Sequence, residues 1–114
     1  MDKNDCRKFY DFDEDDDIGE GGFGRVYKAK KKGTNEERAL KIIKKKKIKD
    51  NFKAINRRNP TDEELKKNYK DIYEEIKFMK LMENNNENKN TVKFYESFEN
   101  DKEFVIVMEY CEQN

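Results

Sequence analysis

A glycine-rich segment at residues 18–26 has the composition and spacing of a phosphate-binding loop. It contains the pattern G-x-G-x-x-G-x-V. Glycine permits unusual backbone angles and close approach, so the N–H groups of such a loop can face phosphate oxygens. The candidate nucleotide-contacting residues of the segment are Ile18, Gly19, Glu20, Gly21, Gly22, Phe23, Gly24 and Val26. The spacing alone also fits a glycine-rich hairpin turn, so neighbouring features must decide between the two interpretations.

The context of the glycines excludes three other ligand-binding loops. A dinucleotide-binding loop follows a hydrophobic strand and opens a helix, whereas residues 11–17 are acidic and residues 25–30 are strand-like. A P-loop ends in Gly-Lys-Ser/Thr, which Gly24 and its successors do not match. A calcium loop starting within the acidic run would lack the required glycine and glutamate.

Lys41 is the single charged residue of an apolar run, Ala-Leu-Lys-Ile-Ile. A lysine among apolar neighbours is costly unless its ammonium reaches solvent, an anion or a carboxylate. Glu75 lies at the margin of the apolar face of a predicted helix, where its carboxylate can reach a neighbouring strand. Glu74 is turned about 100° away. The sequence therefore favours an ion pair between Lys41 and Glu75, with an exposed lysine at a sheet edge as the alternative.

The composition is that of one small domain. The chain has 114 residues, 46% of them charged and 33% hydrophobic, and its 26 basic residues equal its 26 acidic ones. Because the charges balance, no net electrostatic attraction would draw the whole chain onto nucleic acid or anionic lipid. Cys6 and Cys111 lie far apart and there is no histidine, so we expect no metal site. No apolar stretch approaches the ~20 residues needed to cross a bilayer, so we expect a cytoplasmic protein, with a nuclear location left open.

Alternating apolar segments predict a sheet. Residues 25–30 and 37–43 flank turn-forming residues and indicate an antiparallel hairpin. Residues 91–98 and 104–110 indicate two further strands after a polar, low-complexity loop. Order is expected to begin near Ile18, which gives the element order β-β-β-α-β-β.

One long helix is predicted from a capping box at residues 61–64, and it should extend from Asp62 to about Met82. Its apolar face consists of Leu65, Tyr69, Ile72, Ile76 and Met79.

Two charged segments lack an apolar period. Residues 1–17 are interpreted as an acidic leader, because residues 11–17 hold six carboxylates, and residues 44–59 as a solvated basic insertion. Residues 1–15 and 44–59 are expected to be mobile.

The ordered set of motifs resembles the N-terminal, ATP-binding lobe of eukaryotic protein kinases. The resemblance rests on the glycine segment, Ala39-x-Lys41, Glu75 and the hinge-like sequence VMEYC at residues 107–111. It covers residues 18–114 and implies an α+β lobe, a five-stranded antiparallel sheet with one main helix, truncated at the hinge. The sequence departs from the family in its acidic first segment and in the 34 positions from Lys41 to Glu75, which require the basic insertion.

The resemblance also implies roles for individual residues. Gly19, Gly21 and Gly24 would cover the phosphates of ATP, and Lys41, held by Glu75, would contact the α- and β-phosphates.

 The resemblance further makes Met108 the gatekeeper, and it assigns hinge hydrogen bonds with the adenine edge to the Glu109 carbonyl and the Cys111 amide.

The resemblance implies that Val26 and Ala39 pack on the adenine. Met79 and Phe94 match the family's hydrophobic spine. The implied activity is transfer of the ATP γ-phosphate to a protein hydroxyl, with serine or threonine favoured over tyrosine. Mg²⁺ is expected only with a C-terminal lobe. The expected partners are ATP, that lobe and a protein substrate. The 114 residues alone are expected to be catalytically incomplete.

Two other functions stay open at this point. A noncatalytic kinase-like module could bind a partner through its exposed interlobe face. A basic nucleic-acid-binding domain could use Lys44 to Arg58, although a solvated loop is favoured and nucleic acid is not an expected partner.

Overall fold

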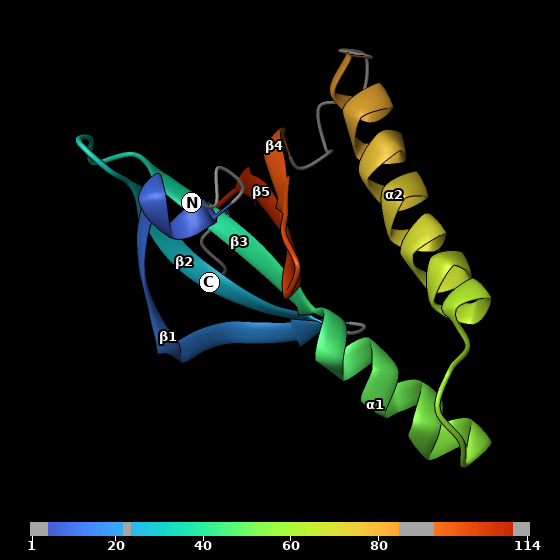
Figure 1. The fold of residues 1–114 in the computed structure, drawn as a ribbon. Coiled ribbons are helices and arrows are strands. Elements are labelled where there is room, and N and C mark those ends of the chain that lie inside the picture. The colour runs from blue at the N-terminus through green and yellow to red at the C-terminus, as the bar shows by residue number, and fades with distance from the viewer. Residues whose placement is uncertain (1–4, 22–23, 85–92, 111–114) are drawn as a thin grey trace.

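The computed structural model describes residues 5–21, 24–84 and 93–110, which form one antiparallel sheet with helices beside it (Figure 1). The elements in chain order are a 3-10 helix η1 (Cys6–Lys8), β1 (Tyr10–Gly21), β2 (Gly24–Lys31), β3 (Glu37–Lys44), α1 (Lys45–Asn56), α2 (Asp62–Asn84), β4 (Phe94–Glu99) and β5 (Glu103–Glu109). The strand order is β1-β2-β3-β5-β4. This confirms the predicted α+β class and five-stranded sheet, with two α-helices in place of one.

Each face of the sheet has its own hydrophobic core, because successive side chains of a strand point to opposite faces. The first core cluster contains Cys6, Tyr10, Tyr27, Ala29, Leu40, Ile42, Val105 and Val107. The second contains Ile43, Ile48, Ile72, Ile76, Phe94, Phe104 and Ile106. The helix η1 therefore covers one face through Cys6, and α1 and α2 cover the other. Strand β5 contributes to both clusters, which explains its unbroken apolar sequence.

Strand β1 includes the acidic run, so the expectation that order begins near Ile18 is wrong. Tyr10 pairs with Lys31 and Phe12 with Ala29, and the pairing is then interrupted until Asp17. The four residues between them bulge out of register and carry exposed carboxylates. The bulge removes the alternation by which a strand is recognised in sequence, whereas the aromatic side chains at its N-terminal end anchor the strand in the first core cluster.

Helix α1 occupies most of the basic insertion, so the expectation of a loop there is also wrong. Lysine and alanine are good helix formers, and Ile48 with Phe52 four residues later gives the segment one apolar side. Ile48 is 2% exposed and belongs to the second core cluster. The helix ends at Asn56 and is capped by Arg57, which has a left-handed backbone and donates its N–H to the Lys53 carbonyl over 2.7 Å.

Helix α2 begins where the capping box predicts. The N–H of Glu64 donates to Thr61 Oγ1 over 3.2 Å, and the N–H of Thr61 donates back to Glu64 Oε1 over 3.0 Å. All five residues of its predicted apolar face pack in or against the second core cluster. Within the described residues, no helix combines the length and the apolar character that a membrane span requires.

Candidate nucleotide-binding site

The predicted ion pair between Lys41 and Glu75 is present and joins the sheet to α2. Lys41 Nζ lies 3.6 Å from Glu75 Oε1, and the two side chains are 20% and 48% exposed. Glu74 instead lies 4.0 Å from Lys70 on its own helix. The preference for Glu75 follows from helix geometry, because Glu75 lies three residues after Ile72 and four before Met79, which pack in or against the second core cluster. The choice of Glu75 over Glu74 is therefore confirmed.

The residues predicted to contact adenine lie on the same face of the sheet as Lys41. Strand pairing aligns Val26 with Lys41, and Lys41 with Ile106. Two residues further along, Ala39 pairs with Met108. Side chains two apart on a strand share a face, so Val26, Ala39 and Met108 surround Lys41 on the α2 side. The arrangement places the Lys41 ammonium beside three apolar side chains.

The glycine segment connects β1 to β2 beside this face. Gly19 pairs with Val26, and Gly21 pairs with Gly24. A Cβ at Gly24 would lie 2.9 Å from both the Ile42 carbonyl oxygen and Ile43 Cγ1. Gly24 is thus required for close approach of β2 to β3.

The other residues predicted in this segment differ in their surroundings. A Cβ at Gly19 would meet nothing within 4 Å, so the space beside it is open. Ile18 is half exposed, and Glu20 forms an ion pair with Arg25 over 3.3 Å. Gly22 and Phe23 lie outside the described residues.

The predicted hinge begins at the end of β5. Glu109 is the last residue of the strand, and its N–H donates to the Lys93 carbonyl over 2.8 Å. Cys111 lies outside the described residues. Met79 and Phe94, predicted as spine residues, both belong to the packing of the second core cluster, with Phe94 buried and Met79 packed against it.

Three residues that sequence reasoning missed tie α2 to the rest of the lobe. The hydroxyl of Tyr73 donates to Glu99 Oε1 over 2.7 Å, and Lys45 Nζ lies 3.0 Å from Glu99 Oε2. Burial, followed by the nearby Glu99 carboxylate, raises the pKa of Tyr73 to about 12. No local pattern marks these residues, because the contacts join α1, α2 and β4. Their effect is to fix the helix that carries Glu75.

Two aromatic contacts reinforce the position of α2. The rings of Tyr69 and Tyr73 approach Phe104 edge-on, with centroid distances of 5.4 and 5.5 Å. Lys45 Nζ also lies 4.9 Å from the centroid of the Phe104 ring. The helix is therefore held by its side chains against β5, at the strand that borders Lys41 in the sheet.

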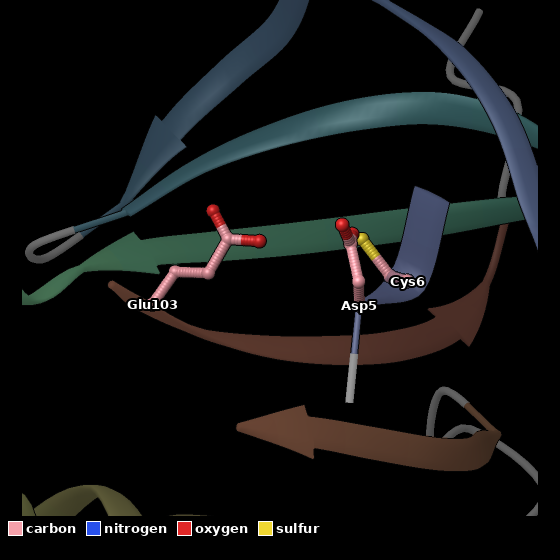
Figure 2. Close-up of side chains that lie close together, drawn as sticks. All are labelled: Asp5, Cys6 and Glu103. Atoms are coloured by element: carbon pink, nitrogen blue, oxygen red, sulfur yellow. The ribbon is translucent and has the colours of Figure 1, made fainter. Parts of the chain in front are cut away.

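A cluster of potential metal ligands lies on the opposite face, where Asp5 and Cys6 face Glu103 at the start of β5 (Figure 2). Arg7 occupies both carboxylates, with Nη1 2.6 Å from Glu103 Oε2 and 3.2 Å from Asp5 Oδ1. Burial raises the pKa of the Cys6 thiol to about 12, which disfavours the thiolate that binds metals. The geometry is that of an arginine-centred ion-pair network, and we assign no metal to it.

Comparison with known proteins identifies the family. The family described as "Protein kinase domain" matches residues 12–114. Calcium-dependent protein kinase 5 of Plasmodium falciparum (isolate 3D7) is 34% identical over 95 residues, which are 83% of this chain and 13% of the relative. Serine/threonine-protein kinase 36 of Mus musculus is 36% identical over 95 residues, 83% of this chain and 6% of the relative. The chain thus spans only a small part of the relatives it matches.

A solved structure has the same fold. A crystal structure of Rad53 in complex with AMP-PNP matches with a TM-score of 0.58 and 20% identity, covering 94% of this chain and 23% of that one. At this identity the likeness concerns the fold alone. The family match, which begins within β1 and includes the acidic bulge, shows that the chain belongs to the protein kinase family.

Proposed function

We propose that this chain is the ATP-binding lobe of a serine/threonine protein kinase. The observation that carries the proposal is the ion pair of Lys41 and Glu75 on the apolar face formed with Val26, Ala39 and Met108. An adenine ring can pack on the apolar side chains, while the Lys41 ammonium binds phosphate oxygens. The serine/threonine class is supported by the names of two relatives, serine/threonine-protein kinases TIO and 36.

The described residues fit the nucleotide but not its metal. Glu75 is the carboxylate beside Lys41, and the ion pair already engages it. In protein kinases, magnesium is held by a D-F-G aspartate and a catalytic-loop asparagine, and an H-R-D aspartate accepts the substrate proton. The 114 residues contain no histidine and no D-F-G sequence. We therefore propose that phosphoryl transfer requires a C-terminal lobe, and we assign no step of it to this chain alone.

In the assembled enzyme, this lobe would supply positioning and charge. Glu75 would hold the Lys41 ammonium at the phosphates, and the β1–β2 hairpin would cover them.

The absence of cysteine pairs or clusters in the sequence favours a reducing, cytoplasmic setting.

Amide chemical-shift mapping of the chain with ATP tests the proposal. We expect ATP to shift the amide signals of Val26, Ala39 and Lys41 in a saturable manner. A short RNA is the comparison ligand, because binding through α1 would instead shift Lys46 and its neighbours. ATP shifts confined to α1, or RNA binding more tightly than ATP, would support the nucleic-acid alternative and reject the proposal. Binding of an isolated kinase C-terminal lobe without any ATP binding would support a noncatalytic module.

A further inference from the structure

A cavity of about 740 Å³ lies away from the nucleotide face, between η1, the start of α1 and the β4–β5 turn. Its lining residues are Asp5, Arg7, Lys44, Lys45, Lys46, Lys49, Asn100, Asp101, Lys102 and Glu103. Half of them are lysines, and Lys41 is not among them. The segments that form it are far apart in sequence but joined by the N–H of Lys45, which donates to the Lys102 carbonyl over 2.8 Å.

Two of the cations in the cavity wall are already neutralised. Arg7 donates to Glu103 and Asp5, and a third carboxylate, Glu14, accepts from its Nε over 3.1 Å. Lys45 pairs with Glu99 and lies over the Phe104 ring. These contacts also engage two of the lining carboxylates, those of Glu103 and Asp5. The walls of the cavity are thus fixed by internal ion pairs.

Four other lysines lining the cavity have no such partner. Within the described part of the chain, no ion pair or side-chain hydrogen bond engages the ammonium groups of Lys44, Lys46, Lys49 and Lys102. The single lining carboxylate that is not engaged is that of Asp101. Four ammonium groups beside one carboxylate leave a local excess of positive charge, although the chain as a whole has a formal net charge of zero.

The first turn of α1 adds to this positive potential. It has no acidic residue, and the N-cap residue, Lys44, makes no side-chain hydrogen bond to the helix. The start of a helix carries a partial positive charge, which an acidic side chain usually compensates. Here four lysines at the start of α1 line the same cavity: Lys44, Lys45, Lys46 and Lys49. The lysines and the N-terminus of the helix therefore both attract an anion to the same place.

We propose that this cavity binds an anion carrying two or more phosphate groups. Phosphates suit the site because lysine ammonium groups bind them as point charges and helix N–H groups donate to them. We infer more than one phosphate from the number of ammonium groups without an ionic partner, which come from both the start of α1 and the β4–β5 turn. The ligand is a free polyphosphorylated small molecule or the headgroup of a polyphosphorylated lipid, which share this chemistry.

The test compares two matched double variants of the chain. Lys46→Gln with Lys49→Gln removes two cavity cations from exposed helix positions and retains good helix formers. Lys66→Gln with Lys67→Gln removes the same charge from exposed positions on α2, outside the cavity. Binding of inositol trisphosphate is measured by titration calorimetry at low salt. Sedimentation with phosphatidylcholine vesicles, with or without phosphatidylinositol bisphosphate, measures the lipid source.

We expect saturable binding of inositol trisphosphate, of the bisphosphate vesicles or of both, and amide shifts at Lys46 and Lys102 but not at Val26. The cavity variant should bind about tenfold more weakly, and the control variant should change by less than about twofold. Binding of only one probe identifies the source and supports the proposal. Equal losses in the two variants, no saturable binding of either probe, or equally tight binding of poly-glutamate would overturn it.

This result is separable from the nucleotide proposal. ATP also carries phosphates, so the cavity variant is titrated with ATP as well. The site on the Lys41 face predicts that the cavity variant keeps its ATP-induced shifts at Val26 and Ala39. Absence of ATP-induced shifts at Val26 and Ala39 in the wild-type chain, with its inositol trisphosphate binding intact, would reject the nucleotide proposal alone.

Discussion

Lys41 Nζ on β3 lies 3.6 Å from Glu75 Oε1 on α2, while the adjacent Glu74 pairs with Lys70 on its own helix. Two neighbouring glutamates of one helix thus engage different partners. Among the described residues, the Lys41–Glu75 pair is the ionic contact that joins α2 to β3, the middle strand of the sheet. Because Glu75 is about half exposed, this contact contributes modestly to stability, and its effect should appear in ligand binding.

Replacing either glutamate by glutamine provides a matched comparison. Glu75→Gln should weaken ATP binding by about fivefold, because Lys41 must then be ordered at the phosphates without its partner. Glu74→Gln should leave ATP affinity unchanged within error. Calorimetric titration of both variants measures the difference. Equal effects of the two substitutions would contradict the role assigned to Glu75.

Two glycines of the β1–β2 hairpin should respond differently to alanine. Gly24→Ala should destabilise the chain by about 1–3 kcal/mol, because its Cβ would overlap the Ile42 carbonyl oxygen and Ile43 Cγ1. Gly19→Ala has open space and should change the free energy of unfolding by less than about 0.5 kcal/mol. Urea unfolding measures both values. A destabilised Gly19→Ala with a neutral Gly24→Ala would show that the close approach of β2 to β3 is wrong.

The thiol of Cys6 should be unreactive in the folded chain. It is fully buried in the first core cluster, and burial raises its pKa to about 12, so little thiolate is present near neutral pH. In a Cys111→Ser background, modification by a thiol reagent should require opening of the N-terminal segment and accelerate strongly in urea. Modification at the denatured-state rate without urea would instead support the sequence-based expectation that residues 1–15 are mobile.

The capping box predicts acid sensitivity at the start of α2. Two hydrogen bonds from Arg58, each 2.7 Å, followed by the Thr61 backbone, lower the pKa of Glu64 from 4.5 to about 2. A lowered folded-state pKa means that this stabilisation is complete above about pH 4.5 and is lost as the pH falls toward 2.

A Glu64→Gln variant should lose less helical circular dichroism than the wild type over this pH interval. Glu63→Gln, one residue earlier on the same turn, is the control and should follow the wild type. Identical acid transitions in all three proteins would show that the Glu64 contacts do not stabilise the helix.

The features that sequence reasoning predicted are those with local signals. The capping box and the spacing of Ile72 and Ile76 define α2 without reference to the rest of the chain. The pairing of Lys41 with Glu75 could be predicted because each is a charged residue beside apolar neighbours. The β2–β3 hairpin likewise follows from alternation and from a turn in which Gly33 has a positive φ of 80°.

The features that were missed depend on contacts between distant residues. The acidic part of β1 is ordered by pairing with β2 and by the packing of Tyr10, which a count of carboxylates does not reveal. Helix α1 depends on Ile48, whose apolar period is obscured by the surrounding lysines. Tyr73 and Glu99 are 26 residues apart in the sequence, so a local sequence pattern cannot predict the hydrogen bond between them.

Calorimetric titration of ATP into the wild-type chain and the Lys41→Met variant tests the central claim most directly. Methionine retains an unbranched apolar side chain but removes the ammonium, so ATP affinity should fall by at least about tenfold. Lys30→Met, at an exposed position on β2, is the control and should bind ATP as the wild type does. Saturable wild-type binding with this loss is the predicted result. Equal ATP affinity in the wild type and Lys41→Met, or no ATP binding by the wild type, would contradict the account.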